Sequence, residues 1–289
     1  MNSPERGRAL TPRRLAILAA LLLLLLLAWS VAVEPRWVAV RRIDHRVTGW
    51  QGPPLRVAVA SDWHFTKRPA WRVMSVERAQ QLVDEINAAA PDVILLLGDF
   101  ISDRHYRATL APTAEEEIAL VLGRLRAPLG VHAVLGNHDW WHDGPRFAAA
   151  LQARGIRVLE NDARAIDAGV WLAGIGDHST GHSRPRTAIA KIPAQAFTLV
   201  MMHDPASLFD LPPLHGLALA GHTHGGQVYL PFLGAPLVPG AAPRRWAYGW
   251  LDNPGIPARV TSGLGVSMLP VRLNMRPEWL LITIDAALG

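Results

Sequence analysis

Five short apolar runs, each ending in residues that can bind a metal, constrain this chain more than any other feature. The residues that follow these runs are Asp62 and His64, Asp99, Asn137, His203, and His222 and His224. Short continuous apolar runs are typical of buried strands in α/β sheets, and sites in such sheets collect beyond the carboxyl ends of the strands. We therefore expect these side chains to meet at one edge of a sheet.

The last of these stretches is a His-x-His turn with glycines on both sides, Gly221 to Gly226. Because glycine leaves the turn uncrowded, His222 and His224 can point into one small volume. Alone, this pattern is also that of a polar turn after a strand. Four further stretches of ligand type, arranged in order along the chain, favour a metal site.

The donor types indicate which metals the site takes. The chain has no cysteine, which excludes disulfides and thiolate ligands. The remaining donor types, carboxylate, amide oxygen and imidazole, suit Mn, Fe or Zn. Two ions about 3.5–4 Å apart need a bridging carboxylate and about three further ligands each. The seven candidates fit that count as follows: Asp62, His64 and His224 for the first ion, Asn137, His203 and His222 for the second, and Asp99 as the bridge.

Hydrophobic periodicity predicts an α/β fold. Strands are expected at 37–47, 56–60, 93–97 and 131–135, and helices at 76–90, around 118–125 and around 147–153. The remaining expected strands, 157–159, 170–175, 199–202, 217–220, 258–262 and 280–284, crowd the second half and predict a second sheet packed on the first. We expect a basic tail and membrane segment at 1–34, a connecting segment with an entry strand at 35–49, and the catalytic domain at 50–289.

An apolar run from residue 15 to residue 33, with leucine at 21–27, predicts a membrane helix. Nineteen residues span roughly 28 Å, close to the hydrocarbon thickness of a bilayer. Signal-peptide cores are shorter, about 7–15 residues, which favours a retained anchor over a signal cleaved near Ser30 to Ala32. Arginines flank the run on both sides, so the sequence leaves open which face of the bacterial inner membrane carries the domain.

The charge balance excludes one class of partner. The first 14 residues carry four arginines against Glu5, which accounts for +3 of the formal net charge of +5. The rest of the chain is close to neutral and has no excess of positive charge of the kind that binds nucleic acid. The sequence carries no signal for the oligomeric state.

The five motifs resemble those of the calcineurin-like metallophosphoesterases. Their pattern of D-x-H, GD, GNH[DE], a lone H and GH-x-H is met at 62–64, 98–99, 136–139, 203 and 221–224, and the resemblance covers residues 50–289. The membrane segment, Gly-Gly-Gln after His224, and the stretches 262–266 and 270–272 resemble the membrane-linked branch of bacterial phosphodiesterases. The resemblance implies a four-layer α/β/β/α sandwich, with a di-metal site at the strand ends, behind one N-terminal transmembrane helix.

The expected chemistry is hydrolysis of a phosphoester by a metal-bridging hydroxide, with His138 as the general acid. The family places the carboxylate that orients this histidine three residues after the bridging aspartate, where this chain has Ser102. Asp103 and Asp139 are therefore both candidates for that role. Arg272 is either a structural cation or a contact for the substrate phosphate.

A membrane segment on a phosphoesterase favours a lipid-linked or nucleotide-linked lipid substrate. The family resemblance implies UDP-2,3-diacylglucosamine, hydrolysed in lipid A biosynthesis, as the best named candidate. The alternatives are a cell-envelope phosphodiesterase with another substrate and a non-catalytic metal-binding scaffold, although a scaffold would typically have lost ligands that this chain retains. The loop 230–243 is apolar for a loop, and we expect it to lie near the bilayer.

Overall fold

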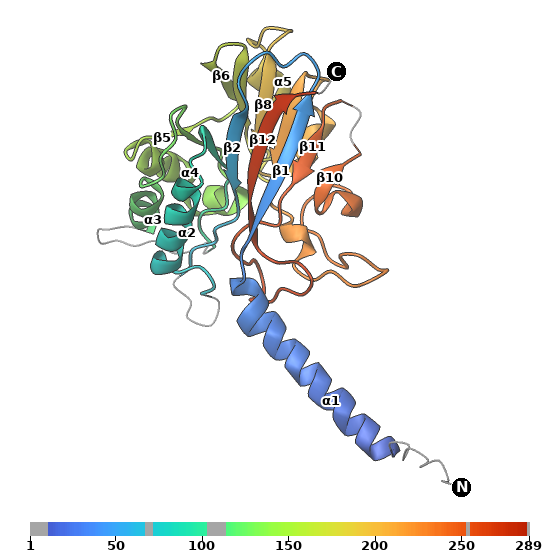
Figure 1. Ribbon diagram of the computed structural model, residues 1–289. Helices are drawn as coiled ribbons and strands as arrows, with labels where there is room; N and C mark the ends of the chain where they lie inside the picture. The colour runs from blue at the N-terminus through green and yellow to red at the C-terminus, as the bar shows by residue number, and fades with distance from the viewer. Residues whose placement is uncertain (1–10, 67–71, 103–113, 253–254, 288–289) are drawn as a thin grey trace.

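Two six-stranded sheets face each other in the computed structural model, which describes residues 11–66, 72–102, 114–252 and 255–287. The first sheet has the order β1 (Ala39–Val47), β12 (Glu278–Ala286), β2 (Leu55–Ala60), β3 (Val93–Leu96), β4 (Val131–Ala133) and β5 (Ile156–Val158). The second has the order β10 (Gly249–Leu251), β11 (Ala258–Val260), β9 (Gly216–Ala220), β8 (Phe197–Met202), β7 (Val170–Ile175) and β6 (Asp162–Asp167). Figure 1 shows β1, β12 and β2 of the first sheet in front of β8 of the second.

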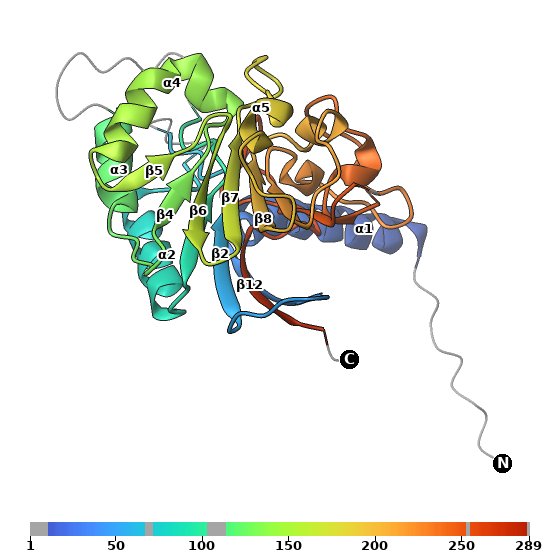
Figure 2. The same ribbon diagram turned by 90° about the horizontal axis from the view of Figure 1, so that it is seen from above.

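The strands are apolar on both faces because both faces are covered. In β2, Val57 and Val59 face the second sheet, while Ala58 and Ala60 face the helices. Figure 2 shows α2 (Val76–Ala88), α3 (Ala114–Leu122) and α4 (Asn137–Gln152) together on the outer side of the first sheet. The outer face of the second sheet packs on α5 (Pro185–Ile189) and η4 (Pro205–Phe209). The expected four-layer sandwich is confirmed, with a thin fourth layer.

Helix α2 follows directly from its sequence. Ser75 caps it by accepting a hydrogen bond from the backbone amide of Arg78, and the apolar stripe includes Val83 and Ile86. The helix stops two residues earlier than expected. Ala90 adopts the left-handed region (φ 46°) directly before Pro91, because a residue that precedes proline is disfavoured in the helical region.

Helix α4 begins ten residues before the expected start. Gly136 precedes its first residue, Asn137, and the helix kinks at Asp143, two residues before Pro145. The first turns carry site residues such as Asn137 and His138 and therefore show no regular apolar stripe. An apolar stripe could therefore reveal only the part of the helix beyond the kink, which contains Phe147 and Leu151.

Two strands from the second half of the chain join the first sheet instead of the second. Strand β5 pairs with β4, and β12 inserts between β1 and β2, parallel to β1 and antiparallel to β2. The segment 35–49 therefore supplies an outer strand of the first sheet. Strands β6 and β10 were not predicted, because β6 alternates charged and small residues and β10 is three residues long.

Among the described residues, one helical stretch is long and apolar enough to cross a bilayer, Pro12–Arg36. It consists of α1 (Pro12–Ala28), one π-helical turn η1 (Trp29–Val33) and one 3-10 turn η2 (Glu34–Arg36). The leucines of α1 are exposed, and the helix leaves the domain at its lower end (Figure 1). Length and composition are the only grounds on which this stretch is a candidate span.

The core between the sheets gives a stability prediction. Leu95 on β3 is fully buried in it, so Leu95→Ala should lower the free energy of unfolding by about 2–5 kcal/mol. Leu120 on α3 is 55% exposed, and the matched Leu120→Ala should change the free energy by less than about 0.5 kcal/mol. Denaturant titration of the full chain in detergent measures both, and equal shifts would contradict the assignment of this core.

Candidate metal centre

Every candidate ligand lies just beyond the carboxyl end of a central strand and is buried. Asp62 and His64 follow β2, Asp99 follows β3, and Asn137 opens α4 after β4; His203 follows β8, and His222 and His224 follow β9. None of the seven is more than 6% exposed. Because the two sheets face each other, strand ends from both sheets supply one site.

Five of these ligands share an unusual backbone conformation. Asp62, His64, Asp99, His222 and His224 all have positive φ, between 49° and 68°. This left-handed region is uncommon for residues other than glycine and costs about 1 kcal/mol or more each. It turns consecutive side chains back toward the strand ends, and such strain persists only where the surroundings hold it in place.

The first subsite is formed by Asp62, His64 and His224. The two Nε2 atoms lie 3.0 Å apart, and Asp62 Oδ1 lies 3.4 Å from the Nε2 of His224. The close approach depends on Gly221, where a Cβ atom would collide with the Ser61 hydroxyl and the Asp62 carboxylate. Three donor atoms therefore converge on one point.

The second subsite is formed by Asn137, His203 and His222. His203 Nε2 lies 3.1 Å from Asn137 Oδ1 and 3.1 Å from His222 Nδ1. Asp99 Oδ2 lies 3.3 Å from the same His203 atom and 3.4 Å from His64 Nε2 of the first subsite. Asp99 thus stands between the two groups, in the position of a bridge.

The protonation states fit cations at these points. Burial lowers the pKa of His64 to about 3 and also lowers the pKa values of His222 and His224, so these imidazoles are neutral with lone pairs free to bind. Burial raises the pKa of Asp62 to about 6. Burial lowers the pKa of His203, but the neighbouring Asp99 carboxylate raises it, and the net shift is upward. Positive charge beside Asp99 is therefore favoured, and bound cations would supply it.

Neighbouring groups fix the orientation of the imidazoles. His203 Nδ1 lies 2.7 Å from the carbonyl oxygen of Leu97, which directs Nε2 into the site. His222 turns its Nε2 toward the carboxylate of Asp204, 3.8 Å away, and that carboxylate accepts a hydrogen bond from Ser179. Sequence reasoning assigned no role to Asp204, although its position directly after His203 was a usable signal. Ser179 gave no signal.

His138 is held by a backbone carbonyl. Its Nδ1 lies 3.1 Å from the carbonyl oxygen of Ser102, and one of its ring nitrogens lies within 4.8 Å of ligand atoms of His64 and Asp99. Asp139, one of the two expected orienting carboxylates, instead accepts hydrogen bonds from the backbone amides of Phe100, Ile101 and Gly136. It therefore clamps the loop after β3 to the start of α4. Asp103, the other candidate, lies outside the described residues.

Arg272 is a buried structural cation in this conformation. It is fully buried, and its Nη2 donates to the carbonyl oxygens of Ser262 and Gly265, each at 2.7 Å. Burial lowers its pKa to about 10. Its guanidinium lies 3.5 Å from His224 Nδ1, behind the ligand. These contacts argue against the phosphate-contact alternative and for the structural one.

A two-sheet fold with buried carboxylate, amide and imidazole donors around a bridging aspartate defines a binuclear metallohydrolase. Residues 55–226 match the calcineurin-like phosphoesterase family, and the chain belongs to it. The protein is accordingly a metal-dependent phosphoesterase, as the motifs predicted. The family is di-metal dependent, and the His and Asp groups of this site are placed so that they could hold metal ions.

Similar proteins share most of this chain. Phosphodiesterase YaeI of Escherichia coli (strain K12) is 30% identical over 85% of this chain and 87% of its own length. The uncharacterized metallophosphoesterase YkuE of Bacillus subtilis (strain 168) is 26% identical over 80% and 79%. A bovine transmembrane protein with a metallophosphoesterase domain is 26% identical over 79% of this chain and 53% of its own length.

The pKa values predict how metal affinity depends on pH. Protons on Asp62 and His203 must leave before a cation binds, so binding releases protons and the affinity should rise by about tenfold or more from pH 5 to pH 7. Calorimetric titration of the metal-stripped full chain with Mn²⁺ in buffers of different ionisation enthalpy measures both quantities. An affinity that stays constant across this range would rule out the assignment of these two groups as ligands.

Proposed function

We propose that this protein is a membrane-anchored phosphodiesterase that hydrolyses a phosphodiester or pyrophosphate of a lipid-linked or nucleotide-linked lipid substrate. The observation that carries the proposal is the end of the domain at which the metal ligands lie. Strand β1 starts beside the end of α1, and β2 runs antiparallel to its neighbour β12 and thus toward α1. The metal ligands after β2 and β3 therefore lie at the end of the domain from which α1 leaves.

The junction between α1 and the domain supports a retained anchor. The carbonyl oxygen of Ser30 accepts a hydrogen bond from the amide of Arg272 at 2.9 Å, and the Glu34 carboxylate accepts one from the amide of Met275 at 2.7 Å. Glu34 is only 3% exposed. Cleavage after Ala32 would remove the first of these contacts, whereas a signal sequence needs no contact with the mature fold.

The chemistry divides between the ions and the chain. When bound, two divalent ions activate a water molecule and neutralise charge on the phosphoryl oxygens. Ser102 holds Nδ1 of His138, so Nε2 of that ring is left to protonate the departing oxygen. The donor set suits Mn, Zn or Fe.

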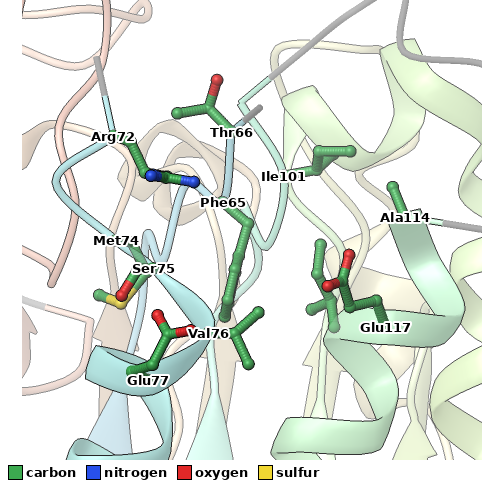
Figure 3. A pocket seen from close by; sticks show the side chains of 11 residues that line it. Phe65, Thr66, Arg72, Met74, Ser75, Val76, Glu77, Ile101, Ala114 and Glu117 are labelled. Carbon is green, nitrogen blue, oxygen red and sulfur yellow. The ribbon is translucent and has the colours of Figure 1, made fainter. Parts of the chain in front are cut away.

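A pocket beside the site, with both apolar and charged lining residues, offers room for part of the substrate. It measures about 250 Å³ and is lined by Phe65, Thr66, Arg72, Met74, Ser75, Val76, Glu77, Ile101, Ala114, Glu117 and Ile118. Figure 3 shows Phe65, the residue after ligand His64, projecting between the starts of α2 and α3. The start of α2 also contacts the anchor, because Arg78 donates to the carbonyl oxygen of Arg36 at 2.6 Å.

UDP-2,3-diacylglucosamine, a lipid pyrophosphate of lipid A biosynthesis, is the best named candidate substrate. It would require a domain on the cytoplasmic face of the inner membrane, so a terminal reporter that is active only outside that membrane would exclude it. A cell-envelope phosphodiester is then the alternative substrate. Mass-spectrometric identification of a lipid that accumulates in a deletion strain would decide between them.

The first test separates an enzyme from a metal-binding scaffold. The full chain in detergent should hydrolyse bis-p-nitrophenyl phosphate with Mn²⁺ and lose this activity with chelator or in Asp99→Asn, because the bridge then loses a charge. Thermal unfolding with and without Mn²⁺ controls for folding. A folded wild type that binds Mn²⁺ but shows no turnover on this ester or on lipid phosphodiesters would favour the scaffold.

The role of His138 predicts a dependence on the leaving group. His138→Ala should slow hydrolysis of an alkyl phosphodiester by about 10²–10⁴-fold, because an alkoxide must be protonated as it leaves. With p-nitrophenolate, which leaves without a proton, the loss should be much smaller. Equal losses on both substrates, with metal content unchanged, would show that His138 only supports the structure.

A further inference from the structure

Six exposed apolar side chains gather on two loops that flank the base of α1. This apolar rim consists of Tyr229, Phe232, Leu233, Leu237, Met268 and Leu269. Phe232 shows the full accessibility of a free side chain, and Met268 is 85% exposed. Contiguous exposed apolar groups on a soluble surface are rare and mark contact with a protein or a membrane.

The two loops of the rim are tied to each other. The amide of Leu273 donates to the carbonyl oxygen of Gln227, and the amide of Tyr229 donates to the carbonyl oxygen of Leu273, both at 2.8 Å. The side chain of Gln227 adds bonds to the backbone of Ser267 and Leu269. The rim is therefore one unit rather than two independent loops.

The same unit holds the end of the anchor helix. Ser30 and Glu34 accept the amide hydrogens of Arg272 and Met275, as described above, and these residues lie beside the rim loop at Leu273. In both Figure 1 and Figure 2 the orange loop that follows His224 extends on the side of the domain where α1 leaves. Any bilayer around α1 would therefore meet the rim.

Aromatic and cationic side chains near the end of α1 mark the expected position of the membrane–water interface. Trp29 and Trp37 pack edge to face with ring centroids 5.8 Å apart, and Arg276 lies 3.7 Å over the Trp37 ring. Tryptophan and arginine at the end of an apolar helix are typical of the membrane–water boundary. Exposed Arg244 and Arg245 line a cavity of about 530 Å³ together with the rim residues Tyr229 and Leu233, and Arg245 pairs with Asp252 at 3.3 Å. Arginine beside apolar groups suits contact with anionic headgroups.

We propose that the apolar rim inserts into the leaflet that α1 enters, so that the domain is docked on a lipid surface in one fixed orientation. The inference rests on the proposed membrane anchoring and specifies it. Docking also reaches the metal centre, because the loop that starts after His224 returns at Gly240, where a Cβ atom would lie 2.8 Å from His222 Nε2. The site then faces the headgroup layer from which its substrate comes.

The absence of cysteine makes a depth measurement direct. Phe232→Cys and Met268→Cys are labelled with an environment-sensitive fluorophore in the full chain, reconstituted in nanodiscs of phosphatidylcholine and phosphatidylglycerol at a ratio of about 3:1. Leu120→Cys is the matched control, an exposed apolar residue on α3, the helix that Figure 1 shows on the flank of the domain opposite the orange loop. Lipids with a quencher on the acyl chain should quench both rim labels about threefold or more relative to the control.

Quenching at the rim equal to that at Leu120→Cys would overturn the proposal. So would rim labels that become shielded only when a cell extract is added, because the occupant would then be a protein. Turnover of soluble bis-p-nitrophenyl phosphate by the same labelled chains tests the catalytic function separately. A docked but inactive protein would refute the phosphoesterase proposal and leave the docking intact, and an active but unquenched one would do the reverse.

Discussion

The rest of this structure depends on one constraint: the lone pairs of the buried carboxylate and imidazole ligands must meet in a space from which water is excluded. Carboxylate and imidazole acceptors such as Asp62 and His64 lie within 4 Å of one another with almost no contact with water. Such a cluster is unstable unless positive charge sits at its centre, because unpaired buried acceptors and anions each cost several kcal/mol. Cations stabilise the cluster, and the surrounding fold serves to keep the acceptors in place until cations bind.

The metal ligands are held in place through the main chain, by backbone conformation and by hydrogen bonds to backbone groups. Strand ends in the left-handed region aim the ligands, and Asp139 accepts three amide hydrogens from two loops, so the turn carrying Asp99 cannot move independently of the turn carrying Asn137. Arg272 does the same with carbonyl oxygens behind His224. A buried carboxyl group and a buried guanidinium thus brace the centre through bonds to the main chain.

The sequence was informative where side-chain type carries the structure. Apolar runs followed by ligand types located β2, β3, β8 and β9 and the residues beyond them, because buried strands and metal donors have distinct compositions. Contacts made by the main chain leave no such trace, so Ser102 as the partner of His138 could not be read from residue types. Placement of β12 inside the first sheet depends on pairing between residues more than 200 positions apart, which local pattern does not encode.

If α1 is the membrane anchor proposed above, the continuous helical path from α1 through η2 into the bond between Glu34 and Met275 connects it to the catalytic domain without a non-helical linker. A catalytic domain on a flexible tether samples the volume around its attachment point and can bind substrates in solution or on a facing membrane. A rigid helical connection removes that freedom and confines the search for substrate to the plane of the membrane. Encounter rates would then scale with the number of substrate molecules per unit area of the enzyme's own membrane, and dilution of the surrounding fluid would leave them unchanged.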